Sequence, residues 1–237
     1  MYDPRQHLIV ALDVSTAAAA RNIVAAVGDS ASTYKVGMQL YTAEGPQAVR
    51  DLIASGRRVF LDLKYHDIPT TVASAVSEAA KLGVSMLTVH ASGGGKMLRA
   101  ATEAARNVNP ALLVLGVTVL TSMDEEDLDK LGIRGRVVDQ VSRMAALALA
   151  DGCRGVVTSA LEASVLRREL GDDFAIVAPG IRPAGSEHAD QARVVTPAEA
   201  IASGVTHIVV GRPITAAADP ASEARAILEQ MSLAVSA

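Results

Sequence analysis

The chain has 237 residues, of which 50% are hydrophobic and 20% charged, proportions typical of a globular protein with a sizeable core. No run reaches the roughly 18 uninterrupted apolar residues of a membrane span, and the first residues lack the basic-then-apolar order of a signal peptide, so we expect a cytoplasmic protein. The net charge of −4, with 22 basic residues spread along the chain, argues against a nucleic-acid surface. The single cysteine, Cys153, can form neither an internal disulfide nor a zinc thiolate cluster.

Short apolar segments rich in Val, Ile and Leu alternate along the chain with longer Ala-rich segments of helical periodicity. The predicted strands are 7–13, 33–37, 59–64, 86–90, 112–118, 155–158, 175–178 and 207–210. The predicted helices are 16–27, 46–54, 70–82, 96–107, 137–150, 160–170, 197–203 and 220–231. Strands that are apolar on both faces favour a parallel sheet covered by helices, and eight such units predict a (β/α)₈ barrel over the single domain 1–237. A doubly wound open sheet is the alternative.

Charged and polar residues stand where the predicted strands end, which is where a barrel of this class carries its catalytic groups. In chain order, from the first strand to the eighth, they are Asp13, Lys35, Asp62, Lys64, His90, Thr121, Arg182 and Arg212. The segment 179–196 is too long for a simple connection and predicts an active-site lid.

The third predicted strand carries the most informative group. Side chains two apart on a strand point to the same face, so Asp62 and Lys64 project together, and Asp67 can fold back over them from the following loop. An Asp-x-Lys at a strand end can also be a solvated ion pair. Here Lys35 adds a second cation, and a loop at 211–213 adds backbone N–H groups beside the guanidinium of Arg212, which together predict an anion site.

The Gly-rich run and the histidines are not assigned catalytic roles. The Gly-rich run in HASGGGKML lacks the spacing of a nucleotide-binding loop and indicates a flexible turn. His66 and His90 border the predicted site, but no pair of histidines has metal-ligand spacing with carboxylates, so we expect no metal. His7, His188 and His207 are expected to be surface or structural residues.

The pattern D-x-K-x-x-D-I-x-x-T, formed by Asp62, Lys64, Asp67, Ile68 and Thr71, resembles the orotidine 5′-phosphate decarboxylase family. Further segments similar to that family follow in order along essentially the whole chain: LIVALD, YKVG, VLTS, PGIRP, DQARVVTP and VVGRPIT. The resemblance implies conversion of orotidine 5′-monophosphate to UMP and carbon dioxide, in pyrimidine biosynthesis, without a cofactor.

The resemblance also implies roles for individual residues. Lys64 is the proton donor to C6 of the pyrimidine, Asp62 faces the substrate carboxylate, Asp13 and Lys35 hold the ribose, and Thr121 lies by the pyrimidine. The implied phosphate-binding residues are Arg182, Gln191, Gly211 and Arg212, with Arg182 and Gln191 acting from the lid. By the same resemblance Asp67 and Thr71, with Ile68 between them in the pattern, reach into the site of a second subunit, so a homodimer is expected.

Three alternatives differ in kind. The nearest is a magnesium-dependent relative, such as a keto-gulonate phosphate decarboxylase or hexulose phosphate synthase, but that branch places an acidic ligand where this chain has Lys35, and a cation there would repel Mg²⁺. The second is a phosphosugar isomerase or lyase on a barrel, which leaves the match at Asp67 unexplained. The third is a non-catalytic nucleotide-binding barrel, for which loss of Asp62 or Lys64 would be expected, and both are present.

Overall fold

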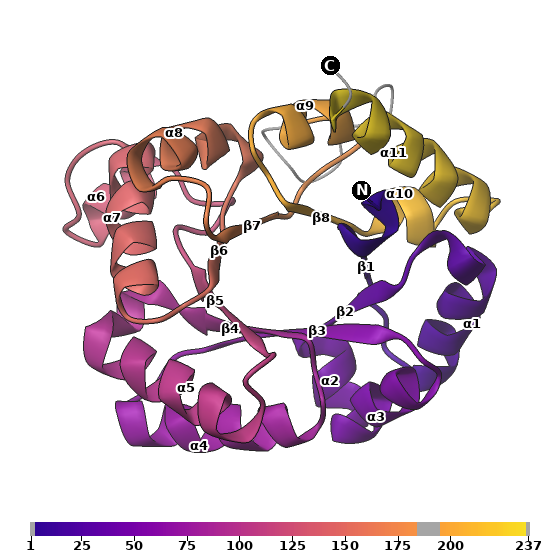
Figure 1. Cartoon of the computed structure of the whole chain (residues 1–237), viewed down its shortest axis with the longest axis horizontal. Coiled ribbons are helices and arrows are strands. Elements are labelled where there is room, and N and C mark those ends of the chain that lie inside the picture. Colours follow the sequence, from indigo (N-terminus) through magenta and orange to yellow (C-terminus); the bar gives the residue numbers. More distant parts are fainter. Residues whose placement is uncertain (1–2, 184–194, 236–237) are drawn as a thin grey trace.

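A computed structural model, which describes residues 3–183 and 195–235, shows a closed barrel of eight parallel strands (Figure 1). Each strand pairs with its neighbours in chain order, and β8 pairs with β1 to close the ring. The strands are β1 (Leu8–Ala11), β2 (Thr33–Gly37), β3 (Arg58–Tyr65), β4 (Met86–His90), β5 (Leu113–Val117), β6 (Gly155–Val157), β7 (Ala175–Ala178) and β8 (His207–Val210).

The helices surround the strands and cover the outside of the barrel (Figure 1). The α-helices are α1 (Ala17–Val27), α2 (Met38–Glu44), α3 (Pro46–Ala54), α4 (Pro69–Lys81), α5 (Gly94–Val108), α6 (Glu125–Lys130), α7 (Val137–Ala150), α8 (Ala160–Leu170), α9 (Pro197–Ala202), α10 (Arg212–Thr215) and α11 (Pro220–Val235). Short 3-10 turns are η1 (Pro4–Gln6), η2 (Gly28–Ser30) and η3 (Ala91–Gly93). None of these described helices is long and apolar enough to cross a membrane.

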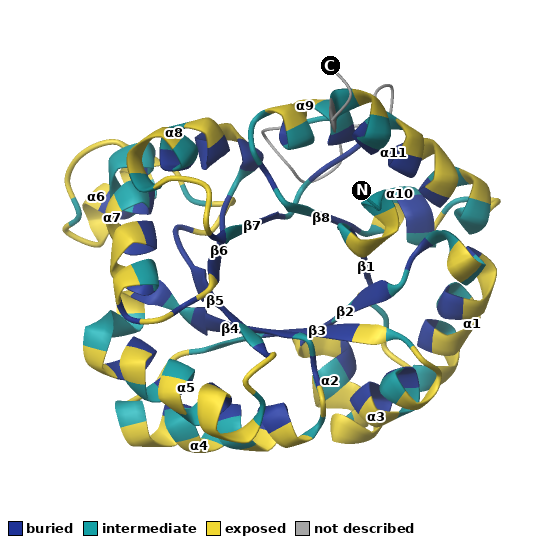
Figure 2. Ribbon diagram, in the orientation of Figure 1, coloured by how far each residue is buried: buried dark blue, intermediate teal, exposed yellow. Residues whose placement is uncertain are grey.

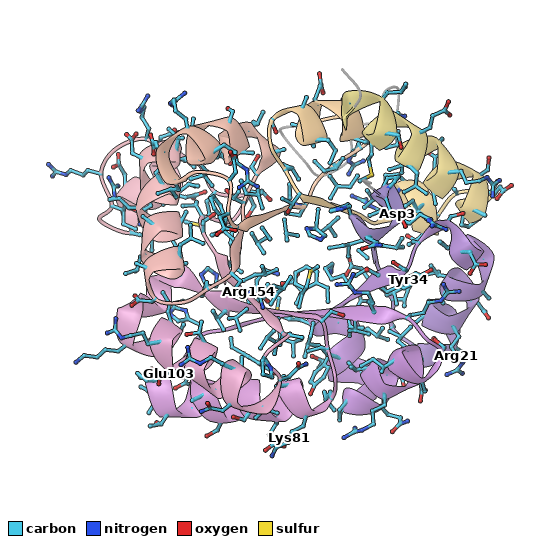
Figure 3. The ribbon with its side chains drawn as sticks, viewed as in Figure 1. Asp3, Arg21, Tyr34, Lys81, Glu103 and Arg154 are labelled. Atoms are coloured by element: carbon cyan, nitrogen blue, oxygen red, sulfur yellow. The ribbon has the colours of Figure 1, made fainter. Side chains whose placement is uncertain are left out.

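Buried side chains form two layers, because each strand presents one face to the helices and the other to the barrel axis. The larger cluster lies between strands and helices, and Figure 2 shows buried residues along the strands and on the helix faces turned towards them. Side chains also fill the opening that the ribbon leaves at its centre (Figure 3). The apolar ones inside the barrel are Ile9, Ala11, Phe60, Met86, Leu115, Val117, Val157, Val177 and Val209.

The eight-stranded barrel confirms the predicted fold class, whereas several local boundaries differ. The first strand ends at Ala11, so Asp13 lies just beyond it rather than in it. The predicted loop at 211–213 begins the short helix α10 at Arg212, with Pro213 in its first turn. The predicted turn in HASGGGKML is the 3-10 turn η3 followed at once by α5, which begins at Gly94.

The opposite, N-terminal end of the barrel holds two histidines at neighbouring strands. His7 precedes β1, and its Nδ1–H donates to the carbonyl oxygen of Thr206 at 2.7 Å. His207 opens β8, and the two imidazole rings lie with centroids 5.0 Å apart. Burial, followed by the nearby His7 and Arg58, lowers the pKa of His207 to about 3. His207 is therefore neutral in the folded protein at neutral pH, in agreement with a structural role.

Candidate active site

The C-terminal ends of the strands enclose two adjoining cavities. One, here called the Lys64 cavity, has a volume of about 220 Å³ and includes Lys64, Asp62 and Thr121 in its wall. The other, the Arg212 cavity, has a volume of about 390 Å³ and includes Arg182, Gly211, Arg212 and Asp13. Lys35, Asp62, Pro179 and Val209 line both cavities. The two cavities together can therefore hold one elongated ligand with an anionic end.

Lys35 and Asp13 form an ion pair at the boundary between strands β1 and β2. Lys35 Nζ donates to Asp13 Oδ1 at 2.8 Å, and the side chains are 12% and 57% exposed. Gly37 makes room for this pair, because a Cβ there would lie 2.9 Å from Lys35 Nζ and 3.3 Å from Asp13 Oδ1. The pair offers a ligand both a cationic donor and a carboxylate acceptor, a combination suited to sugar hydroxyls.

Asp62 and Lys64 lie together at the end of β3, as their spacing predicts. Lys64 Nζ donates to Asp62 Oδ2 at 2.8 Å, and the side chains are 25% and 12% exposed, respectively. Such a pair, largely removed from water, interacts more strongly than a surface pair because the local dielectric constant is lower. The carboxylate holds the ammonium group of Lys64 in one place through this hydrogen bond.

The backbone is irregular at this pair. The pairing of β3 with β4 shifts register between Leu61 and Tyr65. Within that shift, Lys64 has φ of 52°, and it is the one residue other than glycine with positive φ among residues 3–183 and 195–235. Positive φ is unfavourable for most L residues, and residues strained in this way cluster at functional sites. Lys64 thus lines the cavity from a strand end whose backbone is locally strained.

Apolar side chains form much of the rest of the Lys64 cavity wall. Phe60, Val117, Val157 and Val209 line it, and all four belong to the buried cluster inside the barrel. These residues keep the dielectric constant low beside the Asp62–Lys64 pair.

His66 and His90 lie beside each other near this site, with ring centroids 5.4 Å apart. Burial, then the charges of His66 and Lys64, lower the pKa of His90, so its ring is neutral at neutral pH. Its Nδ1 lies 3.2 Å from Ser92 Oγ. Neither histidine lines the Lys64 cavity or the Arg212 cavity.

The Arg212 cavity brings positive groups from two loops together. Arg182, which follows β7, is only 8% exposed, and its backbone N–H donates to the carbonyl oxygen of Val195 at 3.1 Å. Arg212 follows β8 and is exposed, and Gly211 caps the short helix that begins there. With Lys35, these residues place three cationic side chains around one cavity. Gln191, the remaining predicted phosphate ligand, lies outside the described residues.

Asp67, Ile68 and Thr71, the residues of the predicted shared site, line no cavity of their own active site. All three are exposed, and the side chain of Ile68 is 64% exposed. The carboxylate of Asp67 accepts a hydrogen bond from the N–H of Ile68 at 2.6 Å. None of the three lines either cavity. Their predicted roles thus depend on a second subunit and stay predictions.

The structure adds residues to the site that the sequence did not single out. These further residues around the Lys64 cavity are Phe60, Val117, Val119, Leu120, Ser122, Val157, Thr158, Pro179 and Val209. Four of these nine, Phe60, Val117, Val157 and Val209, are apolar strand residues that the sequence pattern assigns equally well to the core. Within the described ranges, which omit 184–194, no three His, Cys, Asp or Glu side chains are grouped so that they could hold a metal ion.

Comparison with known proteins identifies the family. The family model "Orotidine 5′-phosphate decarboxylase / HUMPS family" matches residues 6–227. The orotidine 5′-phosphate decarboxylase of Moorella thermoacetica is 48% identical over 235 residues, which cover 97% of this chain and 93% of that protein. The enzyme of the same name from Afipia carboxidovorans is 50% identical over 232 residues, which cover 98% and 97%.

A solved structure agrees with the sequence comparisons. The crystal structure of orotidine 5′-phosphate decarboxylase from Lactobacillus acidophilus superposes with a TM-score of 0.86 at 38% sequence identity, and the match covers 95% of this chain and 99% of that one. Sequence and fold are thus similar to the same proteins over nearly the whole length. The chain belongs to the orotidine 5′-phosphate decarboxylase / HUMPS family.

Proposed function

We propose that this chain is an orotidine 5′-phosphate decarboxylase, a carboxy-lyase that converts orotidine 5′-monophosphate to UMP and carbon dioxide. The observation that carries the proposal is the arrangement of the two adjoining cavities. One presents the 2.8 Å ion pair of Lys64 and Asp62, and the other gathers Lys35, Arg182 and Arg212. A nucleoside monophosphate has a base at one end and a dianion at the other, which matches this distribution of charge.

In the proposed reaction, the bond between C6 of the pyrimidine and the carboxylate carbon breaks, and carbon dioxide leaves. The electron pair stays on C6, and the Lys64 ammonium group transfers a proton to that carbon. Lys64 then regains a proton from solvent. The positive charge beside C6 stabilises the developing carbanion, which has little conjugative help of its own. Asp62 holds the donor, and its negative charge lies near the substrate carboxylate, where repulsion is relieved as carbon dioxide departs.

The remaining residues are proposed to bind the rest of the nucleotide. Asp13 and Lys35 hold the ribose hydroxyls, and Thr121 lies by the pyrimidine. Arg182, Gly211, Arg212 and Gln191 bind the phosphate, with 179–196 acting as a lid. Contacts to the phosphate are remote from C6, and their binding energy can offset the cost of closing the site and removing water from it.

The magnesium-dependent branch of the family is not favoured. Lys35 Nζ is bound to Asp13 Oδ1 at the junction of the two cavities, and this cation occupies the region where the metal-dependent relatives are expected to place an acidic ligand. A second positive charge beside Lys64 opposes binding of Mg²⁺.

The proposed assembly is a homodimer that acts in the cytoplasm, with each active site completed by the other subunit. Asp67, Ile68 and Thr71 are exposed and line neither cavity of their own chain, as expected of residues that serve a neighbouring subunit. The large exposed side chain of Ile68 is suited to burial in a contact between subunits.

The test is decarboxylation by the purified protein, followed as conversion of orotidine 5′-monophosphate to UMP. We expect turnover that persists unchanged after exhaustive treatment with EDTA. Absence of turnover by a folded protein that binds UMP would contradict the proposed function. Activity that disappears with EDTA and returns with Mg²⁺ would instead assign the chain to the metal-dependent branch.

A further inference from the structure

We infer that Thr88, on β4, is a positioning residue for the Asp62–Lys64 pair, holding the carboxylate of Asp62 and the backbone of Lys64 through one hydroxyl group. This inference rests on the proposed function and adds to it a residue that lines neither the Lys64 cavity nor the Arg212 cavity.

Three hydrogen bonds form a closed ring. The backbone N–H of Lys64 donates to Thr88 Oγ1 at 2.9 Å, and Thr88 Oγ1 donates to Asp62 Oδ1 at 3.0 Å. The other carboxylate oxygen, Asp62 Oδ2, accepts from Lys64 Nζ at 2.8 Å. The directions follow from chemistry, because an N–H group can only donate and an ionised carboxylate can only accept. The hydroxyl therefore uses its proton for Asp62 and a lone pair for Lys64.

The strand irregularity explains why a side chain is needed there. Leu61 pairs with Leu87 and Tyr65 pairs with Val89, so β3 contains more residues than β4 between these two contacts. Thr88 stands between Leu87 and Val89, opposite the irregular stretch. The N–H of Lys64 donates to the Thr88 side chain there. The same bond stabilises the residue with φ of 52°, a conformation that costs about 1–2 kcal/mol in an L residue.

Because the ring of hydrogen bonds is buried, water cannot easily replace the hydroxyl group of Thr88. Thr88 is 0% exposed and Asp62 is 9% exposed, so little water is present to replace a lost bond. The branched Cβ of threonine restricts its χ1 angle, which keeps the hydroxyl directed at both partners. Valine has nearly the same shape but no hydroxyl, so Thr88→Val would leave one oxygen of Asp62 and the N–H of Lys64 without their partner while the packing changes little.

The expected effect is on rate rather than on affinity. Thr88 touches neither cavity, whereas the proposed ribose and phosphate ligands lie on other strands and loops. A displaced Asp62 carboxylate no longer holds the Lys64 ammonium group at the reacting carbon. We expect Thr88→Val to lower kcat about 10- to 100-fold, the range for losing a hydrogen bond to a charged group, with KM and the Kd of UMP changed less than about 3-fold.

Two further variants and one matched control complete the experiment. Thr88→Ser keeps the hydroxyl and should recover kcat to within about 3-fold of the wild type, whereas Thr88→Cys keeps the size but offers only a weak donor and should remain impaired. The control is Thr33→Val on β2. Thr33 is also 0% exposed, but its hydroxyl has no hydrogen-bond partner among the described residues, so its loss should leave kcat unchanged.

The outcomes separate this inference from the proposed function. A wild-type protein without decarboxylase activity would contradict the function itself. With an active wild type, a kcat of Thr88→Val equal to that of Thr33→Val would overturn the positioning role, as would Thr88→Ser impaired as much as Thr88→Val. If Thr88→Val does not fold, Thr88→Cys decides, since wild-type turnover by that variant also overturns the role. A crystal structure of the variant gives a readout independent of activity, because an unmoved Asp62 carboxylate and unchanged Lys64 backbone would contradict the inference.

Discussion

Lys64 combines a reactive ammonium group with a backbone conformation that most residues avoid. Its side chain is held by Asp62 at 2.8 Å, and its φ is 52°. The two properties are separable by substitution, because removing the side chain abolishes the proton donor in every case, whereas the backbone strain depends on whether the new residue has a Cβ.

We predict that Lys64→Ala and Lys64→Gly both lose turnover while retaining UMP binding, since the proposed ribose and phosphate contacts remain. We further predict that Lys64→Gly is the more stable of the two by about 1 kcal/mol, because glycine tolerates positive φ and alanine does not. Denaturant unfolding and UMP titration of both variants measure these quantities.

The two variants control for each other, because both lose the same ion pair with Asp62. At a position of ordinary backbone geometry the order would be reversed, with alanine more stable than glycine. That reversed order would show that the strand end at Lys64 is unstrained. Wild-type turnover by either variant would exclude Lys64 as the proton donor.

The part of the site that was predictable from sequence is the part fixed by strand periodicity. Asp62 and Lys64 stand two apart, and the structure joins them. Thr88 could not be found in that way, because an isolated threonine in the apolar segment MLTVH looks like an ordinary strand residue. Its proposed positioning role depends on the register shift between β3 and β4 and on the positive φ of Lys64. Neither feature can be predicted from the sequence pattern.

At the scale of elements, the long periodic segments were predicted well, whereas several short helices were not. The barrel and the number and order of its eight strands are as predicted, and α3, α7 and α8 have the predicted bounds. Helices α2, α6 and α10 were missed. They have only 7, 6 and 4 residues, respectively, and α6 depends on a capping box in which Asp124 and Asp127 accept hydrogen bonds from each other's backbone N–H groups. A helix this short buries few side chains, and its sequence therefore shows too few apolar positions to reveal a helical period.

The start of β8 gives a prediction about pH. The pKa of His207 is about 3 in the folded protein, below its ordinary value near 6.5, so the unfolded chain binds the proton more tightly. The stability associated with neutral His207 is therefore present above about pH 6.5 and is lost as the pH falls towards 3. From pH 7 to pH 5 the expected loss is about 2 kcal/mol.

Unfolding free energies of the wild type and His207→Gln, measured across this pH range, check the expectation. The variant should lose less stability on acidification than the wild type by about that amount. Thr33→Val is the control for the measurement, because it changes no titratable group and should leave the pH dependence unchanged. Parallel pH curves for the wild type and His207→Gln would contradict the assignment.

At the scale of the whole molecule, the shared active site can be tested by mixing subunits. We predict that Lys64→Ala and Asp67→Asn are each nearly inactive as homodimers, because every site lacks either its own donor or its neighbour's carboxylate. In a mixed dimer of twofold symmetry, one site contains both changes and the other contains neither. After random exchange about half of the dimers are mixed, so about a quarter of all sites should regain wild-type activity.

Each variant taken alone through the same unfolding and refolding should regain no activity, and native mass spectrometry should confirm the mixed dimers. Mixed dimers without activity would show that Asp67 acts within its own subunit. A protein that remains monomeric at assay concentrations and is fully active would exclude the shared site altogether.

Closure of the barrel leaves the first strand incompletely paired during synthesis. β1 pairs with β2 on one side and with β8 on the other, and β8 ends at Val210. A ribosome adding roughly 5–20 residues per second needs about 10–40 s between making β1 and making its second partner. During that interval the nascent chain carries an unpaired strand edge that can template pairing with other chains. The pairing of β1 with β8, which leaves the finished barrel without an edge strand, therefore leaves the growing chain with such an edge until β8 has been made.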